Sequence, residues 1–261
     1  MTRSFEDLVA EGAAVPVEGW DFSWFEGRAT EERAPWGYSG LLADRLARAR
    51  ASLDLQTGGG EVYAFALRRA ARRPDVVAAT ESWAPNLAVA RRTLAPWRAQ
   101  VSEAAEDGDL PFPDGAFDLV SSRHPTGRRW PEIARVLRPG GAYLSQGVGS
   151  GSNRELYEFL MGPQPDDGPT AAQRAADGAR AAGLDVVDLR ETGTRVEFLD
   201  VAAVVHFLRK VVWTVPDFTV DRYRDRLRDL HEVIERDGRF VAHSQRYLIE
   251  ALRPGPPTTP Y

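Results

Sequence analysis

SLDLQTGGGE, residues 52–61, is the segment from which the architecture of this 261-residue chain is inferred. It begins as a short apolar run, passes through Asp54 and then breaks into three glycines at 58–60. A helix-forming sequence follows from Glu61. This order predicts a strand, a tight turn and a helix start, where backbone N–H groups face a bound ligand.

Further along the chain, β-rich runs alternate with helical patterns, as in βαβ units. Strands are expected at residues 51–56, 76–80, 99–104, 116–122, 142–146, 185–191 and 240–252. The pattern predicts an α/β fold with three layers, α-β-α, in which the middle layer is a mainly parallel, seven-stranded sheet. Ligands bind such sheets beyond the carboxyl ends of the strands.

Polar residues collect at that predicted edge. Glu81 follows the second strand, Glu106 and Asp107 follow the third, and Arg123 and His124 follow the fourth. The edge is therefore the expected ligand site.

The glycine turn does not fit the common phosphate motifs. A dinucleotide fingerprint needs a third glycine where this chain has Tyr63, and a phosphate-binding loop needs Gly-Lys-Ser/Thr, which does not occur here. Glu81, placed at the end of the second strand, suits the hydroxyls of a ribose. A ligand with a ribose and without a pyrophosphate fits better.

Three blocks in this order carry a family resemblance: Asp54 to Gly60 followed by Glu81, LPFPDGAFDLV at 110–120, and EIARVLRPGG at 132–141. Together they resemble the class I S-adenosylmethionine-dependent methyltransferases, over roughly residues 40–150. The resemblance implies a Rossmann-like fold, S-adenosyl-L-methionine as cofactor and S-adenosyl-L-homocysteine as product.

The resemblance also implies roles for individual residues. Asp54 and the glycine backbone would hold the methionine end, Glu81 the ribose, and Leu110 the adenine ring. The adenine amino group would donate to Glu106 or Asp107. The implied cofactor residues are Asp54, Gln56, Thr57, Gly58, Gly60, Glu81, Ser82, Trp83, Glu106, Asp107, Leu110, Ser122 and Arg123.

Two positions depart from the family pattern. Gln56 replaces the first glycine of the turn, so the turn is tilted or the amide touches the cofactor. Ser82 stands where an apolar residue usually stacks on adenine. Trp83 either takes over that stacking or packs under the sheet.

His124, in the sequence SRHP, is the candidate general base, and a structural histidine in a turn is the alternative. Arg123 either clamps a carboxylate or forms a surface pair. No His, Asp and Glu spacing suits a metal, so none is expected.

The methyl acceptor is expected to meet aromatic side chains from segment 20–38 and from a helical insertion at 200–238. Segment 20–38 either forms a lid or only anchors a loop-rich arm to the core. The candidate substrate residues are Trp24, Trp36, Tyr38 and Phe207, and Trp20 and Trp213 would add to the same walls. Such a pocket favours a small organic acceptor with an O, N or C nucleophile.

Composition narrows the alternatives. The net charge of -5 and the pI of about 5.5 disfavour a nucleic-acid partner. The chain has no cysteine, and neither a signal peptide nor a membrane span is expected, which predicts a cytoplasmic protein. An RNA or protein methyltransferase, or a non-catalytic cofactor-binding protein, remains the alternative, and the oligomeric state stays open.

A single methyltransferase domain is expected over 1–252. It would comprise an arm or lid at 1–50, a cofactor-binding core at 51–150 and the substrate insertion at 200–238, followed by a disordered tail at 253–261.

Overall fold

The computed structural model describes residues 3–17, 22–105, 107–165 and 168–255. The chain divides into two compact units. Unit 1 comprises Met1–Arg33, Ser150–Gly168 and Thr192–Gln245, and unit 2 comprises Ala34–Gly149, Pro169–Glu191 and Arg246–Tyr261. The expected arm at 1–50 is thus divided between the units, whereas the insertion at 200–238 lies within unit 1. The single-domain expectation stays a prediction.

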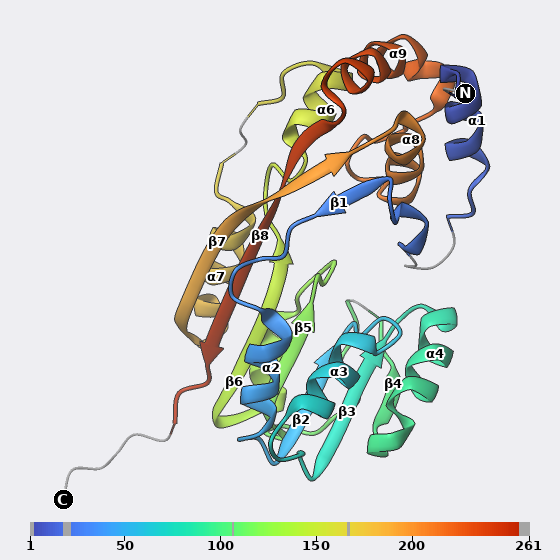
Figure 1. The fold of residues 1–261 in the computed structure, drawn as a ribbon. Coiled ribbons are helices and arrows are strands. Elements are labelled where there is room, and N and C mark those ends of the chain that lie inside the picture. The colour runs from blue at the N-terminus through green and yellow to red at the C-terminus, as the bar shows by residue number, and fades with distance from the viewer. Residues whose placement is uncertain (1–2, 18–21, 106, 166–167, 256–261) are drawn as a thin grey trace, which may run out of the picture. The chain divides into compact units, whose positions relative to one another are not determined.

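Unit 2 contains most of the alternating strands and helices (Figure 1). In chain order they are α2 (Tyr38–Leu46), β2 (Ala51–Leu55), α3 (Glu61–Arg69), β3 (Val76–Glu81), α4 (Ala84–Leu94), β4 (Gln100–Glu103), β5 (Phe117–Arg123), α5 (Trp130–Val136), β6 (Leu137–Val148) and α7 (Ala171–Ala181). Parts of the long strands β7 (Asp185–Phe198) and β8 (Phe240–Leu252) complete the unit.

The strands form a mostly parallel sheet in the order β1-β7-β8-β6-β5-β2-β3-β4. The pairs β2–β3, β2–β5, β3–β4 and β5–β6 are parallel, and β6–β8 is antiparallel. This confirms the expected fold class. The sheet has one strand more than the seven expected, because the three-residue β1 (Ala29–Glu31) pairs with β7.

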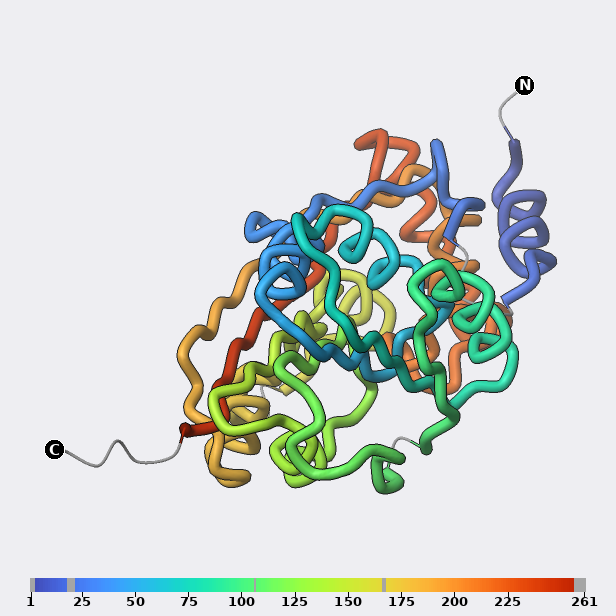
Figure 2. Tube along the Cα trace, turned by 90° about the horizontal axis from the view of Figure 1, so that it is seen from below, coloured from blue at the N-terminus to red at the C-terminus, as the bar shows by residue number. Residues whose placement is uncertain are grey.

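Helices cover both faces of the sheet in unit 2. On one face, α2 and α3 bury Leu42, Leu46 and Tyr63 with Leu119 of β5. On the other face, α5 and α7 pack with side chains such as Tyr143 of β6. Figure 1 shows α2 and α3 in front of the sheet and α7 behind it, and Figure 2 traces the same chain from below. The strands are therefore held from both sides, which fixes their carboxyl ends.

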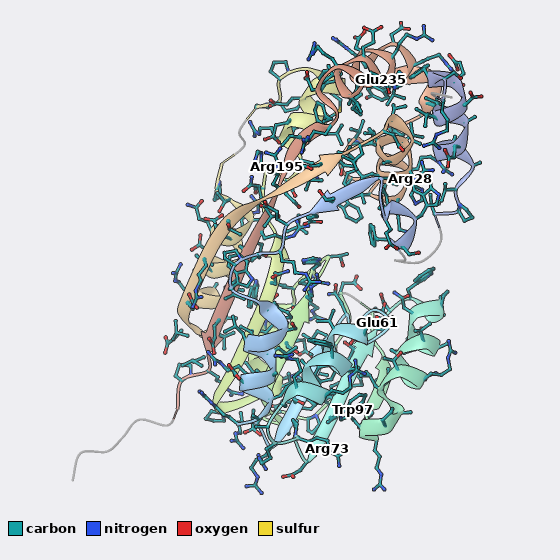
Figure 3. The ribbon with its side chains drawn as sticks, viewed as in Figure 1. Arg28, Glu61, Arg73, Trp97, Arg195 and Glu235 are labelled. Atoms are coloured by element: carbon teal, nitrogen blue, oxygen red, sulfur yellow. The ribbon has the colours of Figure 1, made fainter. Side chains whose placement is uncertain are left out.

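Unit 1 is mainly helical. It contains α1 (Phe5–Ala14), α6 (Arg154–Met161), α8 (Val201–Lys210) and α9 (Val220–Asp237), together with β1 and the remaining parts of β7 and β8. Side chains cap two of these helices: Ser4 caps α1, and the Asp200 carboxylate accepts from the backbone N of Ala203 at 2.7 Å at the start of α8. Arg28, labelled in Figure 3, pairs with Glu11 and with Asp200.

Within the part of the chain that the structure describes, every helix is too short or too polar to cross a membrane.

Candidate active site

The candidate site lies at the carboxyl ends of β2, β3 and β5, which are neighbours in the sheet. Asp54 near the end of β2 is in register with Ser121 of β5, and Glu81 ends β3. The turn after β2 therefore lies close to Asp54 and to Glu81, the two acidic residues that the sequence singled out. All of these residues belong to unit 2.

The backbone of the turn explains its glycines. Gly58 has φ +62° and Gly60 has φ +82°, in the left-handed region that disfavours side chains. A Cβ at Gly60 would also lie 3.0 Å from Cγ of Leu94, whereas one at Gly58 would meet nothing within 4 Å. Gly60 thus allows α3 to pack close to α4, and Gly58 has open space in front of it.

Asp54 is buried beneath this turn, with 6% of its surface exposed. Its carboxylate accepts from Oγ of Ser121 at 2.6 Å and from Oγ1 of Thr57 at 2.7 Å. Burial raises the pKa of Asp54 to about 6, although both hydrogen bonds act in the opposite direction. The side chain therefore anchors the start of the turn to β5.

The Glu81 carboxylate binds the turn from the neighbouring strand. Its Oε2 accepts from the backbone N of Gly58 at 2.7 Å, and its Oε1 accepts from the backbone N of Ser82 and of Trp83, both at 3.0 Å. The ribose residue expected from the sequence and the glycine turn are thus in direct contact.

Gln56 does not follow the glycine pattern, yet it adopts the conformation of a glycine, with φ +50°. Its amide holds the loop after β5. Nε2 donates to the carbonyl of Gly127 at 2.9 Å, and Oε1 accepts from N of Thr126 at 2.8 Å and from its Oγ1 at 3.0 Å. These bonds engage both ends of the amide and link the turn to the loop.

Three side chains form a second connection: Trp36 just before α2, His124 just after β5, and Gln146 in β6. Nε1 of Trp36 donates to Oε1 of Gln146 at 2.7 Å, and Nε2 of Gln146 lies 3.0 Å from Nε2 of His124. An indole N–H can only donate, so Oε1 faces Trp36 and the amide N–H₂ faces the imidazole. Nε2 of His124 is therefore an acceptor, and the proton of the neutral ring is on Nδ1.

The electrostatic environment keeps His124 neutral. Burial, together with the nearby positive charges of Arg123 and Arg246, lowers the pKa of His124 to about 3. Its backbone is in the left-handed region at φ +55°, and its N donates to the carbonyl of Gln146 at 2.7 Å. The ring is held from two directions.

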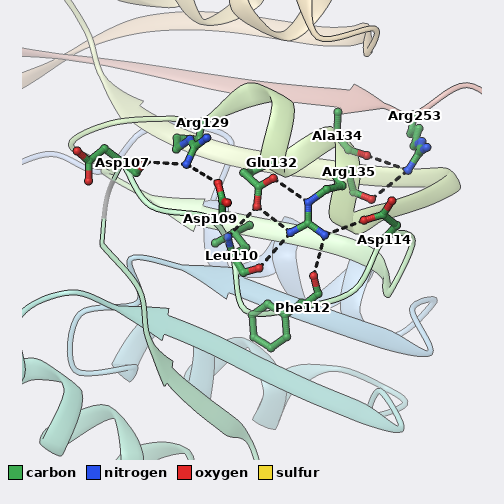
Figure 4. A network of polar contacts seen from close by, with 10 residues as sticks. All are labelled: Asp107, Asp109, Leu110, Phe112, Asp114, Arg129, Glu132, Ala134, Arg135 and Arg253. Atoms are coloured by element: carbon green, nitrogen blue, oxygen red, sulfur yellow. Dashed lines mark hydrogen bonds and ion pairs between the residues drawn. The ribbon is translucent and has the colours of Figure 1, made fainter.

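A network of charged groups fixes the loop that carries Asp107 and Leu110 (Figure 4). Glu132 accepts from N of Leu110 at 2.7 Å and pairs with Arg135 through both oxygens, and Arg135 also donates to the carbonyls of Leu110 and Phe112. The hydrogen bonds from Arg135, together with the one from N of Leu110, lower the pKa of Glu132 to about 2. The network joins the LPFPDG and EIARVLRPGG blocks.

The remaining predicted cofactor residues lie around the same edge. Trp83 is 42% exposed, so it does not pack under the sheet, and stacking on a ligand stays the prediction for it. Ser122 directs its Oγ to the hydroxyl of Tyr143 at 2.7 Å, whereas Arg123 is exposed. Among the described residues, histidines and acidic side chains do not gather in groups of three or more, as a metal site would require.

The predicted substrate residues divide between the units. In unit 2, Trp36 contacts Gln146, and the buried hydroxyl of Tyr38 donates to the carbonyl of Ser122 at 3.0 Å. In unit 1, the ring of Trp24 lies 4.9 Å from that of His206, and the ring of Phe207 lies 5.3 Å from that of Phe198. Trp20 and Glu106 are outside the described residues.

Sequence reasoning missed four residues at this edge: Gln146, Arg128, Tyr143 and Ser145. Ser145 and Gln146 stand in an otherwise apolar strand and are 0% and 6% exposed. Two consecutive polar residues in a buried strand were a readable signal of a polar site.

Part of the chain resembles a known family of domains. Residues 53–145 match a family model described as a methyltransferase domain. No curated protein matches the chain.

Solved structures share the fold. The YcgJ protein from Bacillus subtilis is 16% identical with a TM-score of 0.56, over 84% of this chain and 99% of that chain. A candidate methyltransferase from Bacillus halodurans C-125 is 17% identical with a TM-score of 0.53, over 78% of this chain and 92% of that chain. The [4+2]-cyclase SpnF is 19% identical with a TM-score of 0.52, over 97% of this chain and 93% of that chain.

Proposed function

We propose that this chain, whose residues 53–145 match a methyltransferase-domain family model, transfers the methyl group of S-adenosylmethionine to a small organic acceptor. One observation carries the proposal. The Glu81 carboxylate, at the end of β3, is bonded directly to Gly58 of the glycine turn at 2.7 Å. A carboxylate suited to ribose and a backbone turn suited to the methionine end thus lie in contact at one edge of the sheet.

The residues present fit the cofactor. A carboxylate offers about four acceptor positions, and Glu81 uses three of them, two on Oε1 and one on Oε2. One position on Oε2 is left for a ribose hydroxyl. To accept from both ribose hydroxyls, Glu81 would have to lose one of its three backbone donors. A small shift of the turn would remove the N–H of Gly58.

Asp54 suits the methionine end. With a pKa of about 6, it is ionised at neutral pH, although burial disfavours the charge. The ammonium group of the cofactor would stabilise that ionised form. Cofactor binding and ionisation of Asp54 are therefore expected to reinforce each other.

S-adenosylmethionine supplies a methyl group on a sulfonium, which is already activated for displacement. The protein's contribution is then chiefly positioning. We assign His124 to positioning rather than to proton abstraction, because its Nε2 accepts from Gln146 and a pKa of about 3 makes it a weak base. The Nδ1 hydrogen is the donor that His124 offers to a polar group of the acceptor.

The acceptor is proposed to be small for two reasons. The net charge of -5 does not favour a nucleic acid, and Trp36 and Tyr38 supply aromatic surface in unit 2.

A transfer assay tests the proposal. The protein is incubated with methyl-tritiated S-adenosylmethionine and, separately, with a pool of small metabolites, with transfer RNA and with a protein mixture. Label is expected in the small-molecule pool, and it is expected to be absent with Glu81→Ala. Label in RNA or protein alone would mean that the acceptor is a macromolecule and not a small molecule. Cofactor binding without any transfer would point to a non-catalytic role.

A further inference from the structure

A pocket lies at the carboxyl ends of the strands in unit 2. Apolar groups make one part of its lining, among them Leu55, Leu110 and Ile133. Ser122, Arg128 and Tyr143 make a polar part. The pocket is thus suited to a molecule with an apolar body and one polar group.

Arg128 is the group of interest, because its guanidinium has only neutral and weak partners. Its Nε lies 3.3 Å from the hydroxyl of Tyr143, and its Nη2 lies 3.5 Å from Oγ of Ser145. Its Cζ is 5.4 Å from the ring centroid of Tyr247. Both hydrogen bonds are long for N–H···O contacts. Across the described ranges, no carboxylate pairs with this guanidinium.

The other charges in the lining are already matched. Arg129 pairs with Asp109 at 2.9 Å and also donates to the carbonyl of Asp107. Glu132 is paired with Arg135 at 2.7 Å. Arg128 is therefore the lining charge that still lacks a counter-charge among the described residues.

The hydroxyls around Arg128 accept from it and use only part of its donors. Ser122 donates to Ser145 at 3.0 Å, so the hydroxyl of Tyr143 donates to Ser122 at 2.7 Å. The hydroxyl protons run along this chain and do not point at the guanidinium. A guanidinium has five N–H donors, and the contacts with Tyr143, Ser145 and Tyr247 leave about two of them for a ligand.

We propose that Arg128 binds an oxyanion, a carboxylate or a phosphate, on the methyl acceptor, at the polar part of this pocket formed with Tyr143 and beside the part assigned to the cofactor. A guanidinium matches the two oxygens of such a group in one plane. The inference rests on the proposed function, because the same pocket is lined by Gln56, Leu110 and Ser122, which belong to the predicted cofactor residues.

Binding of small probes tests the site. Benzoate and phenyl phosphate are titrated against the protein, with and without S-adenosylhomocysteine, and benzamide is the neutral control. At least one anion is expected to bind ten times more tightly than benzamide. Arg128→Gln is expected to weaken that anion at least tenfold, since a hydrogen bond to a charged group contributes about 1.5–3 kcal/mol. Whichever anion is preferred identifies the acceptor's oxyanion.

Two variants serve as controls. Arg92→Gln removes an exposed arginine of α4 and should leave anion binding unchanged. Arg128→Lys keeps the charge and should keep part of the binding even if Arg128→Gln lowers the melting temperature. Equal affinity for benzoate, phenyl phosphate and benzamide, or wild-type anion affinity in Arg128→Gln, would overturn the proposal.

The carboxylate of S-adenosylmethionine is an alternative ligand for Arg128. The dissociation constant of S-adenosylmethionine is expected to change less than twofold in Arg128→Gln, and a tenfold loss would assign the guanidinium to the cofactor and overturn the acceptor site. A wild-type protein that binds benzoate and not S-adenosylmethionine would refute the proposed function while leaving the anion site in place.

Discussion

Nε1 of Trp36 lies 2.7 Å from Oε1 of Gln146, and this contact fixes which end of the amide faces His124. Because the amide then donates to Nε2 of His124, the neutral imidazole carries its hydrogen on Nδ1. Spectra that correlate ring protons with ring nitrogens, recorded on histidine-labelled protein at neutral pH, should show the Nδ1–H form for His124.

Gln146→Glu should reverse this tautomer, because a carboxylate accepts both from Trp36 and from Nε2–H of the imidazole. Trp36→Phe should give a mixture of forms, since the amide is then free to turn. His243, which contacts Glu155 in unit 1, is the internal reference. An Nε2–H form in the wild-type protein would rule out the positioning role assigned to His124.

Gln56 is expected to hold the loop after β5 in place. In Gln56→Gly the left-handed backbone is relieved, but the amide that accepts from N of Thr126 is lost. Hydrogen exchange of the Thr126 amide should accelerate roughly tenfold, the equivalent of about 1.4 kcal/mol. The amide of Leu53, inside β2, serves as the control and should not change. Unchanged protection at Thr126 would mean that the loop is ordered by other contacts.

Asp54 should give the protein a distinct pH dependence. Its pKa is about 6 in the folded protein against 3.8 ordinarily, so the folded state binds this proton more tightly than the unfolded chain does. The free energy of unfolding should therefore fall by about 3 kcal/mol as pH rises from 4 to above 6. Urea unfolding of Asp54→Asn should lack this fall. Parallel pH profiles for the two proteins would contradict the assignment.

Glu132 should have the opposite pH dependence. Its pKa is held near 2, chiefly by Arg135, so its contribution is complete above about pH 4.5 and is lost as pH falls toward 2. Glu132→Gln leaves Arg135 poorly matched and should cost about 2–4 kcal/mol at neutral pH. Asp109→Asn, at an 85% exposed side chain, should cost less than about 1 kcal/mol, and an equal loss in both variants would argue against the network.

Much of the fold could be predicted because the deciding signals are local. Ser4 and Asp200 mark helix starts by their own hydrogen bonds, and the alternation of strands and helices requires no long-range knowledge. The short β1 could not be found in this way. Its three residues carry no period of their own, and they become a strand only by pairing with β7.

The site was predicted in part, for a related reason. Asp54 and Glu81 were identifiable because each stands at a recognisable strand end. The partners of Gln56 and Trp36 were not, since Thr126 is 70 residues from Gln56, and Gln146 is 110 residues from Trp36. Only the register of β2, β5 and β6 brings those side chains together.

The most direct test of the account is calorimetric titration of the protein with S-adenosylmethionine, in wild-type form and with Glu81→Ala. Glu103→Gln is the matched control, because Glu103 is the exposed carboxylate in register with Glu81 on β4. We expect S-adenosylmethionine to bind to the wild-type protein and to Glu103→Gln. Its affinity should be at least tenfold lower in Glu81→Ala, because a charged hydrogen bond of about 1.5–3 kcal/mol is removed. Absence of binding to the wild-type protein, or equal binding in Glu81→Ala, would contradict it.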